Sequence, residues 1–332
     1  MAVSTSADAL AAADPALAAR VAVGLVEVEA RLRAAASSDY GFLAETSRHL
    51  VDAGGKRLRP TLVLLAAETG DPTAPGVVDA GVVVELTHLA TLYHDDVMDE
   101  APRRRGAESA NSRYGNTVAI LTGDFLFARA SDVLADLGPE AVRLQARTFE
   151  RLVAGQIAET VGPVGSEDPV AHYLKVLADK TGSLIATSAR FGAMFAGAGA
   201  EIVDGLTSFG EAMGVAFQIS DDIIDIASDG DISGKTPGTD LREGVPTLPT
   251  LLVQRNNSES DARLLELLSG PVAEADVDET LQLLRTNEAM DEARAELARW
   301  LAKARNELEV VPTGAAKRSL ELLADSLAER AT

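Results

Sequence analysis

Three aspartates stand close together at the end of an apolar stretch of the sequence. Asp95 and Asp99 are four residues apart, so on a helix they lie on one face, with Asp96 about 100° round from Asp95. Like charges at this spacing repel each other, and the helix dipole just before Pro102 disfavours them further. The pattern indicates that a cation binds here, although a solvated acidic helix end would show the same residues.

A second cluster, Asp221, Asp222 and Asp225, repeats this spacing at the end of another apolar stretch. The sequence contains no cysteine and only 4 histidines. Two clusters of carboxylate oxygens suit Mg²⁺ better than Zn²⁺, and Mg²⁺ held by carboxylates commonly binds phosphate oxygens as well. The arginine triplet at residues 103–105 follows the first cluster directly and could bind the same anion. We infer that the ligand is a diphosphate.

A basic segment, GGKRLRP at residues 54–60, offers a second anion site. Its glycines interrupt one helix, and Pro60 can begin the next in its first turn. Lys56 and Arg59 are poorly placed at a helix start, because the dipole there is already positive, unless an anion binds them. A solvated basic loop is the alternative interpretation.

With these motifs in this order, the sequence resembles the trans-type polyprenyl diphosphate synthases, which condense isopentenyl diphosphate head to tail onto an allylic diphosphate. Both aspartate-rich DDxxD motifs of that family are present, and the likeness runs from about Gly54 to Pro249. The resemblance implies an all-α fold of the isoprenoid-synthase type, in which a helical bundle over residues 1–332 forms one domain around a deep central apolar cavity. It also implies a homodimer, with the two aspartate clusters of each chain facing each other across the mouth of the cavity.

The resemblance assigns roles to the polar residues. Mg²⁺ would be held by Asp95, Asp96, Asp99, Asp221, Asp222 and Asp225. Isopentenyl diphosphate would be bound by Lys56, Arg59, His88 and Arg105. The allylic diphosphate would be bound by Arg104, Lys180, Thr181, Gln218 and Lys235. Without the resemblance, His88 could equally be a core residue and Lys180 an ordinary surface lysine.

The composition favours helices and excludes several functions. Hydrophobic residues make up 46% of the chain and aromatic residues 4%, with Ala, Leu and Val dominant, as in a helical protein with an aliphatic core. The net charge of −21 argues against binding nucleic acid or docking electrostatically on anionic lipid. No apolar run is long enough to span a membrane and the N-terminus lacks a secretory signal, so we expect a cytoplasmic enzyme that delivers its lipid product to the membrane.

Helical periodicity covers most of the chain. We expect a central helix from Val77 that carries the first aspartates, and a kink at Lys180-Thr181-Gly182, where a glycine interrupts a helical pattern. Further helices are expected at residues 15–36, 61–68, 111–130, 134–160, 170–199 and 209–226, and after Leu251 with a break at Asn256. Residues 1–14 are expected to be disordered, and residues 227–249, rich in Gly, Asp and Pro, to form a mobile loop that closes over the site.

The residues before the first aspartate cluster bear on product length. Short-chain members of the resembling family carry a bulky aromatic residue four or five positions before DDxxD, where this sequence has Thr91 and Ala90, and Thr87 follows one turn further away. Without that stop, a helix of roughly 33 Å from Val77 to Asp99 leaves room for a product of about C30 to C50, such as a menaquinone tail.

Three alternatives are open. Phe125 or Phe127 could supply a floor, and the product would then be geranylgeranyl diphosphate. A terpene cyclase would lack the GGKRLRP segment, and a non-catalytic subunit of a heteromeric synthase would have lost an aspartate motif or its arginines. Neither loss is visible in this sequence.

Overall fold

The computed structural model describes residues 14–228 and 237–330. Their regular structure consists of helices and one short hairpin, so the predicted all-α fold is confirmed. The chain forms two compact units. The first contains Met1–Glu150, Leu184–Gly210 and Val310–Leu320, and the second contains Arg151–Ser183, Glu211–Glu309 and Glu321–Thr332. A single domain over residues 1–332 stays a prediction.

The first unit begins with α2 (Pro15–Ala35), whose start follows from the local sequence. The side chain of Asp14 accepts hydrogen bonds from the backbone N–H groups of Ala16 at 3.1 Å and Leu17 at 2.9 Å, and Pro15 suits the first helical turn. The elements that follow in this unit are α3 (Gly41–Asp52), α4 (Leu58–Ala67), α5 (Val77–Met98), β1 (Arg103–Arg104), β2 (Ala107–Glu108), α6 (Ala110–Tyr114) and α7 (Asn116–Leu137).

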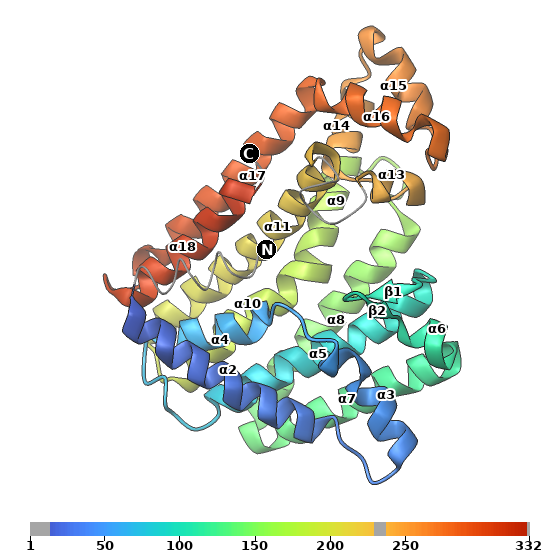
Figure 1. Ribbon diagram of the computed structural model, residues 1–332. Helices are drawn as coiled ribbons and strands as arrows, with labels where there is room; N and C mark the ends of the chain where they lie inside the picture. Colours follow the sequence, from blue (N-terminus) through green and yellow to red (C-terminus); the bar gives the residue numbers. More distant parts are fainter. Residues whose placement is uncertain (1–13, 229–236, 331–332) are drawn as a thin grey trace. The chain divides into compact units, whose positions relative to one another are not determined.

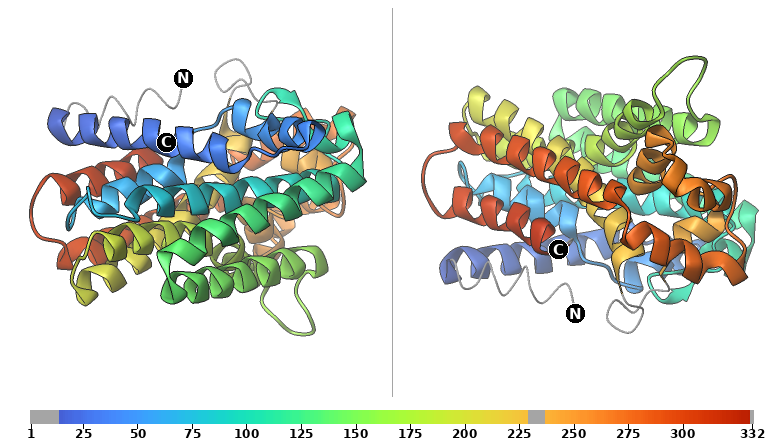
Figure 2. Two further views of the ribbon diagram at one scale, coloured as in Figure 1. Left: turned by 90° about the horizontal axis from the view of Figure 1, so that it is seen from below. Right: turned by 90° about the horizontal axis from the view of Figure 1, so that it is seen from above.

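Helix α5 is the centre of the first unit and is buried along most of its length. It lies alongside α2, α4 and α7 (Figures 1 and 2). Its apolar residues Leu86, Leu89 and Ala90 belong to one core cluster with residues of α2, α3 and α7. Gly123 allows α7 to approach closely, because a Cβ atom there would lie 2.3 Å from the His94 ring and 3.1 Å from the Ala90 carbonyl oxygen.

Two glycines set helix boundaries that the periodicity placed wrongly. The helix expected at residues 111–130 is divided into α6 and α7 at Gly115, where φ is 84°. Helix α7 then continues to Leu137 and ends at Gly138, where φ is 98°. Both φ values lie in the left-handed region that favours glycine, so each glycine ends a helix that apolar spacing alone would continue.

The second unit contains α9 (Pro169–Leu177), a π-helical turn (Ala178–Gly182), α13 (Thr239–Glu243), α14 (Leu248–Asn256), α15 (Ala262–Leu267), α16 (Val277–Arg285) and α17 (Glu288–Glu307). Short 3-10 turns lie at Glu259–Asp261, Glu274–Asp276 and Leu308–Val310. Helix α14 packs against α9 and α17, and it ends at Asn256, where a break was predicted. The kink predicted at Lys180-Thr181-Gly182 takes the form of the π-helical turn.

Four helices contribute residues to both units: α8 (Pro139–Val161), α10 (Ser183–Phe195), α11 (Ala200–Ala227) and α18 (Ala315–Arg330). Of the predicted mobile loop at residues 227–249, the described part contains α13 and the start of α14. The rest of that loop, including Lys235, lies outside the described residues, as do residues 1–13 of the segment expected to be disordered.

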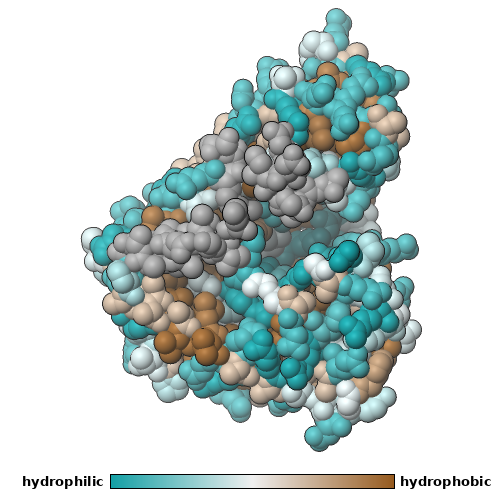
Figure 3. Space-filling view, viewed as in Figure 1, coloured by the Kyte–Doolittle hydropathy of each residue, from teal (hydrophilic) through white to brown (hydrophobic). Residues whose placement is uncertain are grey.

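Among the helices that the structure describes, none is both long and apolar enough to cross a bilayer. Apolar side chains do gather on the surface over α2 (Figure 3), where Val23 and Val26 are 70% and 71% exposed.

Candidate active site

The three aspartates at the end of α5 do not have equivalent surroundings. Asp95 is partly buried and Asp99, the C-cap residue of α5, is exposed, whereas Asp96 is fully buried. Asp96 Oδ1 accepts a hydrogen bond from Arg104 Nε at 2.5 Å, and its Oδ2 finds no partner among the described residues. Burial raises the pKa of the Asp96 carboxyl group, although Arg104 opposes the shift. The outer two carboxylates are therefore more exposed than the middle one, which anchors Arg104.

The β1–β2 hairpin directs Arg104 and Arg105, the last two residues of the arginine triplet, in different directions. Arg105 and Gly106 form its turn with φ values of 53° and 80°, as a two-residue hairpin turn with positive φ at both positions requires. Arg104 reaches Asp96, whereas the Arg105 guanidinium donates to the carbonyl oxygens of Leu50, at 3.1 Å, and Gly54. Glycine suits position 55 beside it, because φ there is 140° and a Cβ atom would lie 2.8 Å from the guanidinium carbon.

Cationic side chains gather around one buried carboxylate, that of Glu85 on α5. Arg57 pairs with Glu85 at 2.9 Å and with Glu29 at 2.8 Å, and Arg105 lies 3.5 Å from Glu85. Burial lowers the pKa of Arg59 to about 10, with Arg105 adding to the effect, and the Arg59 Nε atom has no partner in the described part of the chain. These cations outnumber the carboxylates between them, so the group can bind an anion.

His88 lies one turn beyond Glu85 on the same helix and belongs to this group. Burial, together with the charges of Arg59 and Arg105, holds the pKa of His88 well below its usual value. A neutral imidazole can donate one hydrogen bond to an anion without adding charge. The structure thus brings Arg59, His88 and Arg105 close to one another, and Lys56 lies exposed in the adjoining loop. Their role in binding an anion stays a prediction.

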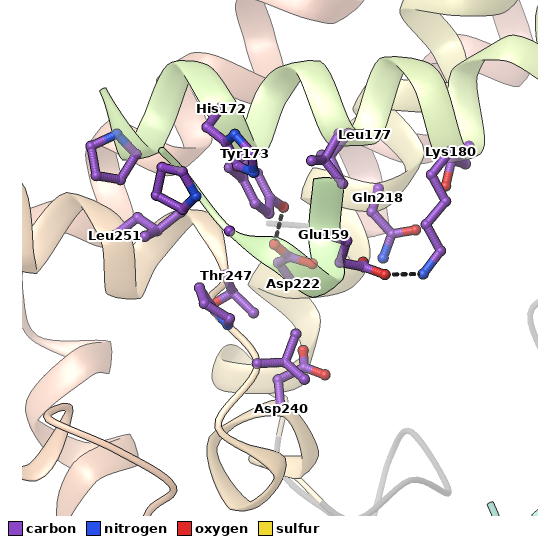
Figure 4. A pocket seen from close by; sticks show the side chains of 17 residues that line it. Glu159, His172, Tyr173, Leu177, Lys180, Gln218, Asp222, Asp240, Thr247 and Leu251 are labelled. Atoms are coloured by element: carbon purple, nitrogen blue, oxygen red, sulfur yellow. Dashed lines mark hydrogen bonds and ion pairs between the residues drawn. The ribbon is translucent and has the colours of Figure 1, made fainter. Parts of the chain in front are cut away.

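In the second unit, Asp222 is the buried member of its cluster. Its Oδ2 accepts a hydrogen bond from the Tyr173 hydroxyl group (Figure 4). The same oxygen accepts a second hydrogen bond, at 3.2 Å, from the backbone N–H of Leu248. Burial raises the pKa of Asp222 to about 8. The carboxylate of Asp225 instead accepts from the backbone N–H groups of Thr239, at 3.4 Å, and Asp240, at 3.3 Å.

A pocket next to Asp222 is lined by residues of α8, α9, the π-helical turn, α11 and the segment before α14 (Figure 4). Lys180 and Thr181 enter it from the π-helical turn, and Gln218 enters from α11, one turn before Asp222. Lys180 pairs with Glu159. Arg151 fixes the turn by pairing with Asp179 at 2.9 Å.

Several residues of these sites were not predicted from the sequence. Arg57 stands inside the GGKRLRP segment, and the signal for Glu85 is a carboxylate within a largely apolar helix. Tyr173 and Asp240 line the pocket of the second unit, but only the fold brings them to Asp222.

The donor atoms near both clusters are hard oxygens, which fit a small divalent cation better than a soft one. Within residues 14–228 and 237–330, no three carboxylate or imidazole side chains already converge as a metal-binding group. The carboxylates of Asp95 and Asp99, together with the unpartnered Asp96 Oδ2, are compatible with a cation at the end of α5.

The three residues predicted to influence product length all lie within the first unit. Ala90 is fully buried in the core cluster, and Thr91 is 8% exposed. Thr87 is fully buried and accepts a hydrogen bond from Gln145 Nε2 at 2.8 Å. Phe127 packs between the rings of His94 and Phe149.

Comparison with known proteins gives consistent matches. The family model described as polyprenyl synthetase matches residues 41–284. The chain is 49% identical over 319 residues to the nonaprenyl diphosphate synthase of Mycobacterium tuberculosis, covering 96% of this chain and 95% of the relative. It is 40% identical over 318 residues to a dimethylallyltranstransferase of the same organism, covering 96% of this chain and 97% of the relative.

A solved structure with the same fold is the geranylgeranyl pyrophosphate synthase from Corynebacterium glutamicum complexed with calcium and isoprenyl diphosphate. It has a TM-score of 0.86 and 46% identity, over 96% of this chain and 98% of that one. The structure of a decaprenyl diphosphate synthase from Rhodobacter capsulatus has a TM-score of 0.86 and 31% identity, and the match covers 98% of this chain and 99% of that one.

Proposed function

The chain belongs to the polyprenyl synthetase family and is a prenyltransferase, and from this premise we propose that it condenses isopentenyl diphosphate head to tail onto an allylic diphosphate to make a long-chain all-trans polyprenyl diphosphate. The observation that carries the proposal is the arrangement along α5. His88, in the cationic group around Glu85, lies seven residues before Asp95, which is about 10 Å along a helix. One helix thus carries an anion site and a cation site at a spacing that suits two diphosphate substrates.

Different residues bind the two diphosphate substrates. Lys56, Arg59 and Arg105 bind the diphosphate of isopentenyl diphosphate, and neutral His88 donates a hydrogen bond to it. Arg104, Lys180, Thr181, Gln218 and Lys235 bind the allylic diphosphate. These charges stabilise the diphosphate that leaves.

Mg²⁺ is the cation we propose, held by Asp95, Asp99, Asp221 and Asp225, with Asp96 and Asp222 in supporting positions. When bound, it would neutralise negative charge on the leaving diphosphate. The calcium in the Corynebacterium glutamicum structure supports a divalent cation, and the all-oxygen donor set supports magnesium.

In the reaction, the bond between the allylic carbon and its diphosphate oxygen breaks. The double bond of isopentenyl diphosphate supplies the electron pair for the new carbon–carbon bond, and a proton is then lost to the released diphosphate. Water must be excluded, because it would otherwise capture the allylic cation.

The proposed product is about C30 to C50, because a helix of roughly 33 Å without an aromatic stop is long enough for several isoprene units. Ala90 and Thr91 stand where an aromatic residue would block growth, and a relative at 49% identity is named nonaprenyl diphosphate synthase. A geranylgeranyl product is the second candidate, supported by the name of the Corynebacterium glutamicum protein. A menaquinone side chain is the proposed use of the longer product.

We also propose that the enzyme is a cytoplasmic homodimer that releases its product to the membrane. Two adjacent apolar residues of α7, Ile120 and Leu121, are 42% and 59% exposed. Large apolar side chains this exposed, on a helix that packs against α5, are candidates for contact with a second copy.

The test is a synthesis assay with purified protein, Mg²⁺, isopentenyl diphosphate and allylic diphosphates of several lengths, with products sized by mass spectrometry. Polyprenyl diphosphates longer than geranylgeranyl support the full proposal. A geranylgeranyl product supports the reaction but refutes the long chain. Cyclised hydrocarbon, or activity only with a second subunit, would support a cyclase or a heteromeric synthase instead.

A further inference from the structure

A layer of polar side chains from three helices lies in the interior of the first unit. Gln145 Nε2 of α8 donates to Thr87 Oγ1 of α5 at 2.8 Å. One turn further along α8, the hydroxyl groups of Thr148 and Thr187 are 2.6 Å apart, and Thr187 belongs to α10. All four residues are at most 7% exposed. The layer therefore links three helices deep inside this unit.

Packing alone does not explain Gln145. Its Oε1 atom is buried and finds no hydrogen-bond partner within the described residues. A buried polar atom without a partner destabilises the folded state, and such atoms are rare enough to require an explanation. An apolar side chain of similar size would avoid this cost, so the glutamine indicates a role other than stability.

The Thr87–Gln145 pair lies below the proposed metal site. Thr87, Thr91 and Asp95 are spaced four residues apart and so share one face of α5. Exposure falls along this face, from Asp95, which is partly exposed, to Thr91 at 8% and Thr87 at 0%. The accessible part of the face thus ends where Gln145 joins α5 to α8, about 12 Å from Asp95 along the helix axis.

We propose that the Thr87–Gln145 hydrogen bond is a gate that decides how far the prenyl chain grows, and that Gln145 is a specificity-determining residue; this rests on the function proposed above. An extended chain advances roughly 1.2 Å per bond. An isoprene unit adds four bonds to the chain, so each unit advances it by about 5 Å. With the first one or two units of the product lying beside the metal site, the chain would meet the pair after two to three further units, at a total close to the four units of a geranylgeranyl chain. Growth beyond that point requires Gln145 to leave Thr87.

The energetic basis of the gate is the hydrogen bond itself. An apolar chain cannot replace Thr87 as the acceptor for the Gln145 amide, so opening leaves further polar atoms buried without partners. A closed gate gives geranylgeranyl diphosphate, and an open gate gives longer products. The side chain at position 145 thereby selects between the two products considered above.

The test compares product lengths of the parent enzyme with Gln145→Ala, Gln145→Phe and Thr87→Val. Gln145→Ala removes the obstacle and Thr87→Val removes the acceptor with little change in volume, so both should lengthen the main product by one or more isoprene units. Gln145→Phe should shorten it to about geranylgeranyl length, because a fixed ring replaces a side chain that can swing away. Products are sized by mass spectrometry, and melting curves show whether each variant folds.

The matched control is Thr148→Val, which changes a buried polar residue on the same helix that bonds to α10 and not to α5. Its product length should equal that of the parent. Folded Gln145 and Thr87 variants that turn over with the parental product distribution would refute the gate, and so would a Thr148→Val shift as large as theirs. If the parent makes no prenyl product at all, the proposed function fails instead.

Discussion

At the scale of single residues, the middle aspartate of each motif differs from the outer two in its surroundings. The middle carboxylate of each is buried and bonded within the protein, Asp96 to Arg104 and Asp222 to Tyr173 and Leu248. The outer carboxylates of the first motif remain more exposed. A repulsive group of charges at a helix C-terminus is unfavourable without a cation, so the outer aspartates are better explained by ligand binding than by stability.

Asp99→Asn tests this difference. It removes one repelling charge at the C-terminus of α5, so the melting temperature of the metal-free protein should be unchanged or raised, while the rate of synthesis should fall more than about 100-fold if Asp99 holds the metal. Rates and melting curves are measured on the same preparation. Retained activity with a large loss of stability would mean that Asp99 is structural.

The comparison variant is Asp96→Asn, in the middle of the same motif. It removes the charge that Arg104, whose side chain is 30% exposed, pairs with. Breaking a fully buried pair costs about 3–5 kcal/mol, and solvent around Arg104 reduces the cost here. We therefore expect Asp96→Asn to lower the melting temperature, unlike Asp99→Asn. Equal stability of the two variants would contradict the assignment of Asp96 as the anchor of Arg104.

His88 leads to a prediction about pH. The pKa of His88 is lowered in the folded protein. Below about pH 6.5, His88 is therefore protonated in the unfolded chain but stays neutral in the folded chain. The contribution of His88 to the free energy of unfolding is therefore fully present above that pH. It is lost as the pH falls, with a slope of at most about 1.4 kcal/mol per pH unit.

His88→Gln should remove this part of the pH dependence while keeping a hydrogen-bond donor in the anion site. The free energy of unfolding, measured by denaturant at pH 7.5 and pH 5.5 without ligands, should fall less in the variant than in the parent. His172→Gln is the control, since His172 pairs with Glu167 near the surface. If His88→Gln and the parent lose the same stability between these pH values, His88 does not titrate as described.

At the scale of elements, the position of a helix depends on how closely the backbone of a neighbouring helix can approach it. The π-helical turn that carries Lys180 and Thr181 crosses α8 at Gly155, where a Cβ atom would lie 2.6 Å from the Lys180 backbone nitrogen. Backbone cannot move aside as a side chain can. The place of Lys180 in the pocket therefore depends on the absence of a methyl group on α8.

Gly155→Ala should displace this turn. Alanine is favoured over glycine inside a helix by about 1 kcal/mol, yet we expect net destabilisation of about 1–3 kcal/mol from overpacking. We also expect a roughly tenfold rise in KM for the allylic substrate, since a displacement of an ångström or less weakens positioning. Gly199→Ala is the control, because nothing lies within 4 Å of its added Cβ. A Gly155→Ala enzyme with parental stability and KM would refute this account of the crossing.

At the scale of the whole molecule, a chain with a net charge of −21 repels other copies of itself. A homodimer must therefore be held by an apolar contact strong enough to overcome that repulsion. Exposed apolar residues occur on α2 and on α7, and α7 packs directly against the helix that carries the first aspartate cluster.

Leu121→Glu should convert the proposed dimer to a monomer, because it places a charge in the apolar contact of two like-charged chains. Mass is measured by analytical ultracentrifugation at several protein concentrations. Val23→Glu on α2 is the control and should leave the mass unchanged. Should Leu121→Glu keep the parental mass while Val23→Glu loses it, the contact lies on α2.

Much of this protein could be predicted from its sequence because the main signals are local. Composition and the family resemblance indicated the all-α fold, and helical periodicity located most of the helices. The i, i+1, i+4 spacing of the aspartates showed which carboxylates share a face, since it depends only on the geometry of one helix. The charge conflict at residues 54–60 indicated an anion site for the same reason. The motifs in their order were sufficient to indicate the family that the comparisons then established.

Only the tertiary structure decided which groups meet. Spacing could not distinguish Asp96 from Asp95. In the structure Asp96 is buried and bonded to Arg104, whereas Asp95 is partly exposed. Tyr173 reaches Asp222 across 49 residues and Gln145 reaches Thr87 across 58. Such contacts depend on how helices pack, and packing depends on the shapes of all neighbouring side chains at once. Glycines 115 and 138 ended helices for a related reason, because a left-handed φ interrupts a helix whatever the apolar pattern around it.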